Sequence, residues 1–188
     1  MRRVIASVNL TLDGFMAGAN GELDWHFPLW NEEMSHYSFE QLSMMDTILL
    51  GRVSYQLMAD YWPYAGVRPL LSEEEAGFAR MMNEHRKVVF SRTLDKLRWK
   101  NSQVVRQHIR EEIWRMKQLP GKDMIIYGSG SIVNMCMEGG LIDEFRLWVH
   151  PVKLERGIPL FYDELQVVKL KFLKTLTFST GVVIFYYR

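Results

Sequence analysis

The stretch from Asp123 to Glu138 constrains the fold most strongly, because a glycine-serine tetrad separates two apolar segments there. The run 124–127 (MIIY) enters the tetrad Gly128-Ser129-Gly130-Ser131, and Ile132 begins the second apolar segment. This pattern predicts a buried strand, a tight turn and a helix that starts at the turn. Such a helix start offers unpaired backbone N–H groups and the positive end of the helix dipole. We therefore expect a phosphorylated cofactor to bind at this turn.

Strand and helix patterns alternate along the chain to about residue 140, and strand patterns dominate after it. Strands are expected over 3–12, 47–50, 87–90, 102–105, 142–154, 167–177 and 181–187. Helices are expected over 32–44, 52–59, 72–85 and 109–118, and the proline-bearing segment 61–71 is expected to be a loop. The alternation predicts one α/β domain over residues 1–188, with a mixed sheet that is parallel early and antiparallel at its C-terminal edge.

The composition argues against several classes of function. A net charge of +1 over 188 residues gives no overall field that would draw the chain to nucleic acid or to an anionic membrane. No apolar stretch reaches the roughly 18 residues needed to span a bilayer. The single cysteine, Cys136, cannot form an intrachain disulfide and is expected to be a small buried hydrophobe. We expect a soluble, cytoplasmic protein, and the scattered histidines predict no metal site.

Glycine, serine and arginine residues follow two further predicted strands. Gly51-Arg52 and Ser54 come after one of them, and Ser91-Arg92 come after the next. Ligands of open α/β sheets bind at the carboxyl ends of the strands, and a guanidinium group can bind phosphate oxygens bidentately. The tetrad is an incomplete G-x-G-x-x-G fingerprint, because Val133 stands where the third glycine would fall. Together, the three strand ends predict a dinucleotide site.

These motifs, in this order, resemble a known family. The segments 7–17 (SVNLTLDGFMA), 49–55 (LLGRVSY) and 88–92 (VVFSR) are similar to the dihydrofolate reductase-like superfamily. The segments 127–131, 140–144 and 159–161 resemble its branch that contains the reductase domain of the riboflavin-biosynthesis deaminase-reductases. The resemblance implies a three-layer α/β/α fold with a mostly parallel central sheet, antiparallel C-terminal strands and bound NADPH.

The resemblance also implies which residues contact NADPH. Phosphate and ribose would lie at Gly51, Arg52 and Ser54, and the 2′-phosphate would lie at Ser91 and Arg92. The pyrophosphate would be wrapped by Gly128, Ser129, Gly130, Ser131 and Ile132. The nicotinamide would be approached by Met16 and Ala17, with Ala6 beneath it. Two arginines near the adenosine end favour NADPH over NADH, because the 2′-phosphate carries about −1.5 to −2 charges by analogy with other phosphomonoesters.

The sequence departs from its relatives on the substrate side. Dihydrofolate reductases bind the pterin with an acidic residue on the first helix, and the corresponding position falls near Ser35. Glu32 and Glu33 are close to it, but they are expected to interact with the helix dipole. Dihydrofolate is therefore not the expected substrate, and no zinc deaminase signature is present. The expected activity is NADPH-dependent reduction of a small nitrogen heterocycle, resembling 5-amino-6-(5-phosphoribosylamino)uracil reductase of riboflavin biosynthesis.

The loop 21–27 supplies the candidate substrate contacts, since the resemblance places it over the nicotinamide. Trp25 could stack on a flat heterocycle, and Asp24 or His26 could relay a proton. The alternative is that Trp25 and Phe27 pin the loop to the core while His26 is solvated. Both interpretations fit the sequence.

Two further questions stay open at the level of sequence. The chain could be an NADPH-binding sensor or nucleotide-binding module without turnover. Its C-terminal strands could also form the edge of a homodimer, because the alternating Val167, Leu170, Phe172 and Leu176 leave apolar surface to cover.

Overall fold

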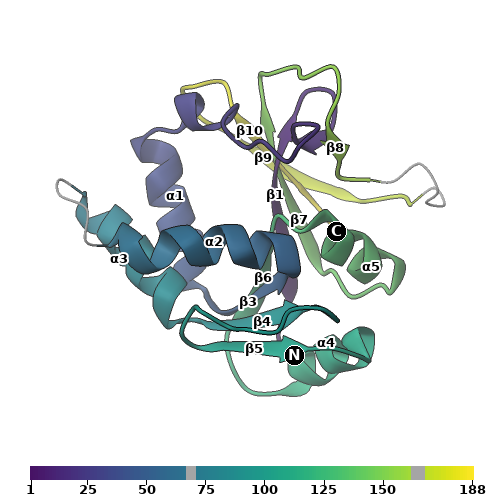
Figure 1. Cartoon of the computed structure of the whole chain (residues 1–188). Helices are drawn as coiled ribbons and strands as arrows, with labels where there is room; N and C mark the ends of the chain where they lie inside the picture. The colour runs from purple at the N-terminus through teal and green to yellow at the C-terminus, as the bar shows by residue number, and fades with distance from the viewer. Residues whose placement is uncertain (67–70, 162–167) are drawn as a thin grey trace.

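The computed structural model describes residues 1–66, 71–161 and 168–188 (Figure 1). Its main sheet has eight strands in the order β5-β4-β3-β6-β1-β7-β10-β9, and β2 pairs with β8 in a small second sheet. The strands are β1 (Val4–Thr11), β2 (Phe15–Ala17), β3 (Met45–Gly51), β4 (Arg86–Phe90), β5 (Ser102–Val105), β6 (Asp123–Tyr127), β7 (Glu144–His150), β8 (Ile158–Pro159), β9 (Phe172–Thr177) and β10 (Val183–Tyr187). The helices are α1 (Glu32–Ser43), α2 (Arg52–Ala65), α3 (Glu73–Glu84), α4 (Ile109–Gln118) and α5 (Gly130–Glu138), with a 3-10 turn at Phe27–Leu29.

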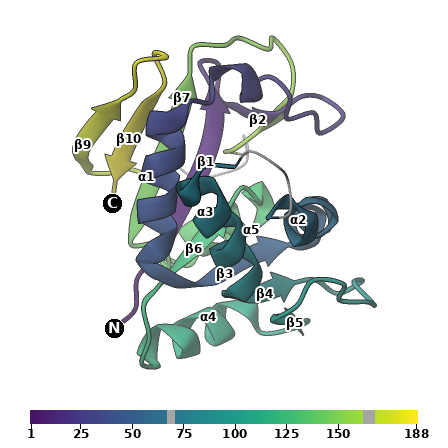
Figure 2. The ribbon, with the colours of Figure 1, turned by 90° about the vertical axis from the view of Figure 1, so that its left-hand side faces the viewer.

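The mixed sheet predicted from the sequence is confirmed. All pairs from β5 to β7 are parallel, whereas β10 runs antiparallel to both β7 and β9. α1, α2 and α3 cover one face of the sheet, and α4 and α5 cover the other (Figures 1 and 2). These are the three layers that the resemblance implied. No helix among the described residues is long and apolar enough to cross a membrane.

Alternation along the strands divides the core into two halves. On β1, Val4, Ala6 and Val8 pack toward α4 and α5, whereas Ile5 packs toward α1 and α2. Cys136 on α5 is fully buried in the first half, as expected. Burial raises the pKa of its thiol to about 12, so this cysteine is not a nucleophile at neutral pH.

Side-chain caps explain where two helices begin. Asn31 Oδ1 accepts the N–H of Met34 over 3.0 Å at the start of α1. Ser72 and Glu75 form a reciprocal capping box at the start of α3. Both helices were expected at these positions because asparagine and serine satisfy the first unpaired N–H groups.

The prediction of a loop from residue 61 was wrong for its first part, because α2 continues to Ala65 through Pro63. Pro63 has no N–H to donate to the carbonyl of Ala59, so the helix continues at the loss of that hydrogen bond. Asn83 of α3 donates its Nδ2 to the carbonyl of Trp62 over 2.9 Å, and Trp62 packs against Phe78. Tertiary contacts therefore stabilise the end of the helix, while residues 67–70 lie outside the described part of the chain.

The C-terminal strands are shorter than predicted. β7 spans seven residues of the expected 142–154 and ends before Pro151, which cannot donate to a ladder. β9 begins at Phe172, and Val167 lies outside the described residues. The two-residue strand β8 was not predicted, since it is too short to give a periodic pattern.

Candidate functional site

The three strand ends identified in the sequence lie side by side. β4, β3 and β6 are parallel neighbours, so their carboxyl ends meet at one edge of the sheet. The backbone N–H of Gly51 donates to Ser129 Oγ over 2.7 Å, and the Ser129 hydroxyl donates to Ser54 Oγ over 2.7 Å. A single hydroxyl group therefore joins the turn after β3 to the turn after β6.

The tetrad turn has the backbone conformation that its glycines suggested. Gly128 and Ser129 have φ values of 57° and 54°, in the left-handed region. A Cβ atom at Gly51 would lie 3.1 Å from Ser129 Oγ, so the two turns leave little space for a side chain there. The Ser129 side chain does not cap α5, and its carbonyl accepts the N–H of Ile132 over 2.8 Å. The first two N–H groups of α5, those of Gly130 and Ser131, have no partner among the described residues.

Two exposed arginines follow the strands on one side of this turn, and neither has a carboxylate partner among the described residues. Arg52 donates only to the neutral Gln56, over 3.1 Å, and the Arg92 side chain forms no ion pair within the described parts of the chain. Ser91 Oγ accepts the N–H groups of Thr93 and Leu94, which shapes the loop that carries Arg92. Two unpaired guanidinium groups at one sheet edge are suited to phosphate binding.

Arg106 holds the same loop from the next strand. Its guanidinium donates to the carbonyls of Arg92 and Leu94, over 3.0 and 2.9 Å. The sequence did not identify Arg106, because its role depends on the contact between the residues after β4 and those after β5. It is a positioning residue for Arg92.

β2 brings Met16 to the other side of the tetrad. A Cβ atom at Gly130 would lie 2.7 Å from Met16 Sδ, so the two residues are in direct contact. The buried Asn134 of α5 donates to the carbonyls of Gly130 and Leu160, over 2.7 and 2.5 Å. Asn134 therefore fixes the start of α5 against the segment that follows β8.

Two predicted cofactor contacts are buried. Ala6 is fully buried in the core on the α4–α5 face, and Ala17 is 5% exposed. Ser7, the neighbour of Ala6, points to the opposite face of β1, toward α1. Only the backbone of Ala6 could therefore line a ligand on the α1 face.

A row of mostly polar side chains follows the α1 face of the neighbouring strands β1 and β7. β1 and β7 are paired in parallel register there, and their alternate residues face the core on the other side. The row consists of Ser7, Asn9, Thr11, Arg146, Trp148 and His150. Trp148 Nε1 donates to Ser7 Oγ over 3.0 Å, and His150 Nε2 lies 3.1 Å from Asn9 Oδ1.

Gln41 of α1 connects this row to Tyr127, which precedes the tetrad turn. Its Nε2 lies 3.4 Å from the hydroxyls of both Ser7 and Tyr127, and its Oε1 accepts from Arg146 over 3.1 Å. Tyr127 is the residue directly before the tetrad, and burial raises its pKa. The described contacts of Gln41 are thus two hydroxyl groups and the Arg146 guanidinium, with no carboxylate among them.

The side chains of the loop 21–27 do not lie as in the alternative interpretation, which has Phe27 packed on the core and His26 solvated. His26 is 8% exposed rather than solvated, and Phe27 is 62% exposed rather than pinned to the core. Trp25 is half-buried, and Asp24 is exposed. Burial lowers the pKa of His26, against the opposing effects of a Leu23 backbone contact and the Asp24 carboxylate.

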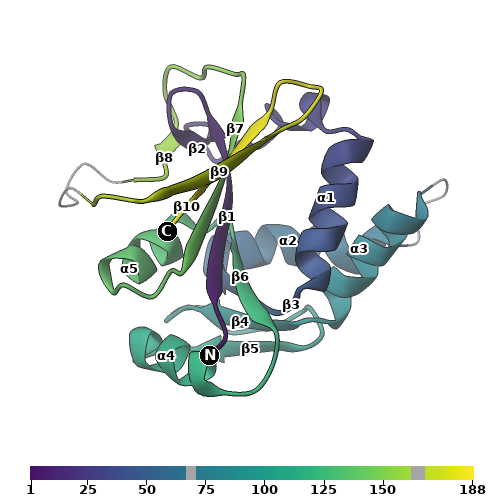
Figure 3. The same cartoon turned by 180° about the vertical axis from the view of Figure 1, so that it is seen from behind.

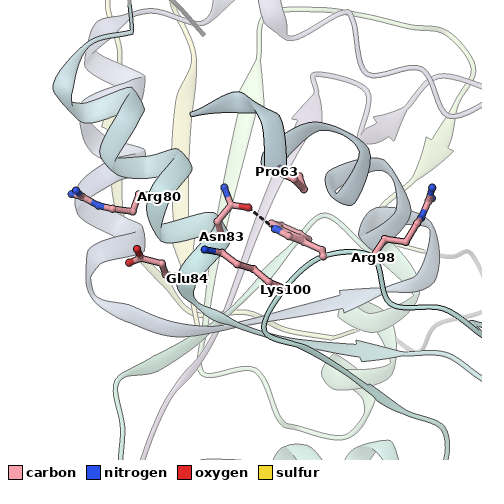
Figure 4. Close-up of a pocket in the computed structure, with 7 residues that line it drawn as sticks. Pro63, Arg80, Asn83, Glu84, Arg98 and Lys100 are labelled. Atoms are coloured by element: carbon pink, nitrogen blue, oxygen red, sulfur yellow. Dashed lines mark hydrogen bonds between the residues drawn. The ribbon is translucent and has the colours of Figure 1, made fainter. Parts of the chain in front are cut away.

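Hollows elsewhere on the surface do not contain the predicted site. One, of about 450 Å³, is lined by Pro63, Arg80, Asn83, Glu84, Arg98, Trp99 and Lys100 (Figure 4). Trp99 Nε1 donates to Asn83 Oδ1 over 2.8 Å, and Arg98 is paired with Asp60. A second hollow, of about 500 Å³, lies beside α3. Neither includes a residue of the tetrad or of the neighbouring strand ends.

Residues 2–184 match the family described as the RibD C-terminal domain. The uncharacterized protein YyaP of Bacillus subtilis is 39% identical over 183 residues, which cover 97% of this chain and 92% of that protein.

Solved structures show the same fold at low identity. A putative riboflavin biosynthesis protein from Shewanella sp. PV-4 superposes with a TM-score of 0.75 at 17% identity, covering 99% of this chain and 98% of that one. Dihydrofolate reductase from Enterococcus faecalis, complexed with NADP(H) and RAB-propyl, has a TM-score of 0.61 at 16% identity, covering 98% and 93%.

Proposed function

This chain belongs to the RibD C-terminal domain family, and we propose that it is an NADPH-dependent reductase of a small, flat nitrogen heterocycle. The reaction would resemble that of 5-amino-6-(5-phosphoribosylamino)uracil reductase in riboflavin biosynthesis. The observation that carries this proposal is that the ends of β4, β3 and β6 lie side by side. An arginine follows each of the first two strands, and the tetrad, which Ser129 links to Gly51, follows the third.

The residues present fit a phosphorylated nicotinamide cofactor. Arg92, with Ser91, would bind the 2′-phosphate of NADPH, and Gly51, Arg52 and Ser54 would bind phosphate and ribose. The tetrad and Ile132 would surround the pyrophosphate at the positive dipole end of α5. The N–H groups of Gly130 and Ser131 have no partner among the described residues, whereas that of Ile132 donates to the Ser129 carbonyl over 2.8 Å. Met16 contacts the tetrad from β2, which supports its place near the nicotinamide together with Ala17.

NADPH supplies a hydride when bound, and the protein's part is to orient the reactants and exclude water. Ser7, Gln41 and Tyr127 line the α1 side of the sheet with neutral hydrogen-bonding groups. Gln41 also contacts the Arg146 guanidinium, and its contacts include no carboxylate, which a cationic pterin would call for. This supports a pyrimidine-like substrate.

A non-catalytic NADPH sensor is the alternative. It is favoured by an aromatic stack beside α1, in which Trp148 is 3% exposed and lies between Trp30 and Phe178 at ring distances of 5.8 and 5.5 Å. Because these rings cover Trp148, its indole offers almost no surface to a substrate.

A screen of acceptors separates the two functions. Purified protein would be mixed with NADPH and pyrimidine, pterin or quinone-type acceptors, and NADPH oxidation would be followed by absorbance. We expect turnover with a pyrimidine. Tight NADPH binding without any acceptor would favour the sensor, and an absence of NADPH binding would contradict both functions.

We also propose that the protein is a homodimer that pairs through β9. This strand is the outermost of the sheet (Figure 3), and its Phe172, Leu173 and Leu176 are 54, 40 and 37% exposed. An apolar edge strand is prone to pair with another chain. Phe172→Lys should give a monomer in sedimentation equilibrium, whereas Leu57→Lys on the exposed side of α2 should not. A wild-type monomer would contradict the proposal.

A further inference from the structure

A hollow of about 450 Å³ lies where α2, α3 and the segment 98–100 meet (Figure 4). It is at the amino ends of β4 and β5, because Glu84 ends α3 shortly before β4 and Lys100 comes shortly before β5. The cofactor edge, at the carboxyl ends of β3, β4 and β6, is at the opposite end of these parallel strands. The hollow is therefore separate from the cofactor edge. Its volume is within the range of about 300–1,000 Å³ that is usual for small-molecule sites.

Hydrogen bonds join the three walls of the hollow. Asn83 of α3 donates its Nδ2 to the carbonyl of Trp62 near the end of α2 over 2.9 Å, and its Oδ1 accepts from Trp99 Nε1 over 2.8 Å. Asn101 donates its Nδ2 to the carbonyl of Glu84 over 2.9 Å, which ties the start of β5 to the end of α3. The walls are thus fixed before any ligand arrives, so binding would not have to order them.

The charged side chains around the hollow are mostly cationic. Arg80, Arg98 and Lys100 line it and are exposed, whereas Glu84 is the one acidic residue among the described lining residues. Arg98 forms an ion pair, but Arg80 and Lys100 have no carboxylate partner within the described parts of the chain. Residues 80–106 contain eight lysines and arginines against two acidic residues, although the whole chain carries only +1. This region therefore has an excess of positive charge that attracts anions.

A buried lysine next to the hollow adds to this excess. Lys87 of β4 is fully buried, and its Nζ donates to the carbonyls of Met82 and Asn83 over 3.0 and 2.8 Å. The same ammonium lies 4.4 Å from the ring centroid of Trp99, which lines the hollow. Burial, and to a lesser extent the charge of Lys100, lower the pKa of Lys87 to about 8. An anion in the hollow would offset the repulsion between the two lysines.

We propose that the hollow binds the phosphate group of a small molecule, at a site separate from the cofactor edge. An arginine can hold two phosphate oxygens with parallel N–H donors, and a lysine ammonium binds phosphate as a point charge. Arg80 and Lys100 make these contacts, because their side chains are exposed and unpaired. The hollow has room for more than a phosphate ion, and Glu84 can accept a hydroxyl or amino group from the rest of the ligand. These features favour a phosphate ester over the free ion.

An NMR titration that follows the Trp99 indole N–H tests this site directly. This group bonds Asn83 in the wall of the hollow, so its signal does not depend on phosphate bound at the cofactor edge. The signal is identified by its absence from the spectrum of Trp99→Phe. The probes are glycerol 3-phosphate and inorganic phosphate, with glycerol and acetate as controls, all at one ionic strength.

We expect both phosphate probes to shift the signal, and both controls to bind at least about tenfold more weakly, the effect of losing one hydrogen bond to a charged group. Tighter binding of glycerol 3-phosphate than of inorganic phosphate would assign the site to a phosphate ester. Equal binding would assign it to the phosphate ion. Acetate bound as tightly as phosphate would overturn the choice of phosphate as the ligand group.

Two double variants test which residues hold the phosphate. Arg80→Gln with Lys100→Gln removes two charges from the hollow, and Arg52→Gln with Arg92→Gln removes two from the cofactor edge. All four side chains are exposed, so neither variant leaves a buried charge unpaired. The hollow variant should bind glycerol 3-phosphate at least about tenfold more weakly, and the cofactor-edge variant should change by less than about twofold. Thermal unfolding without probes serves as the control for folding.

Three outcomes would overturn the proposal. The first is a Trp99 signal that neither phosphate probe shifts in the wild type. The second is binding that weakens in the cofactor-edge variant but not in the hollow variant. The third is an equal loss in both variants, which would mean that the total positive charge, rather than the hollow, attracts phosphate. None of these outcomes bears on whether the protein is a reductase.

Discussion

Replacing Arg92 with alanine should weaken NADPH binding by about ten- to a hundredfold while changing NADH binding by less than about threefold. A hydrogen bond to a charged group contributes about 1.5–3 kcal/mol, and only NADPH has the 2′-phosphate that this guanidinium would contact. Arg92 is exposed and has no ion-pair partner within the described residues, so its removal leaves no buried charge behind. Fluorescence titration with each cofactor measures the two dissociation constants.

Arg98→Ala is the matched control. Arg98 is also an exposed arginine, with a side chain 65% exposed, but it is paired with Asp60 beside the hollow of Figure 4. Its loss should leave both dissociation constants unchanged. An equal loss of NADPH and NADH affinity in Arg92→Ala would refute the assignment of Arg92 to the 2′-phosphate. A similar loss of NADPH affinity in both arginine variants would indicate that the total positive charge, rather than a contact of Arg92, governs binding.

Replacing Arg146 with methionine should lower the free energy of unfolding by about 3–5 kcal/mol, the usual effect of breaking a buried ion pair. Arg146 Nε lies 2.6 Å from Glu144 Oε1, and both side chains are 14% exposed. The variant leaves the carboxylate buried with only the exposed Arg3 near it, at 3.4 Å, and it removes a donor to Gln41. Urea unfolding at neutral pH measures the loss.

The double variant Glu144→Gln, Arg146→Met tests the cause. It removes both charges, so its unfolding free energy should recover part of what the single variant loses. If the double variant is less stable than Arg146→Met alone, the unpaired carboxylate is not the source of the loss. A single-variant loss below about 1 kcal/mol would mean that the pair is effectively solvated.

Local sequence patterns were sufficient to predict most of the strands and helices. Apolar periodicity located the strands and helices, and Asn31 and Ser72 marked helix starts, because capping depends on residues three positions apart. The end of α2 was missed, since its stability depends on Asn83, a residue in another helix. The sequence around Ala6 likewise does not show which face of β1 its side chain occupies, so its burial among α4 and α5 was not predicted.

The candidate site was also predictable only where neighbours along the chain identify its residues. Arg52, Arg92 and the tetrad were selected as candidates because each follows an apolar run within a few residues. Asn9 and His150 were not selected, although the alternation of polar and apolar residues in SVNLT along β1 could have indicated a polar face. Nothing local to His150 distinguishes it from the other scattered histidines.

The sequence by itself determined the order of strands and helices, the glycine turns and the cationic strand ends, because these depend on neighbours along the chain. Only the tertiary structure decided that Ser129 bonds Gly51 across 78 positions and that His150 meets Asn9 across 141. Such contacts arise when parallel strands pair in a given order, and that order is set by the packing of the whole sheet. In the proposed function, the tetrad would be the cofactor end of the site, and the strand pairing would create the surface on which a substrate lies.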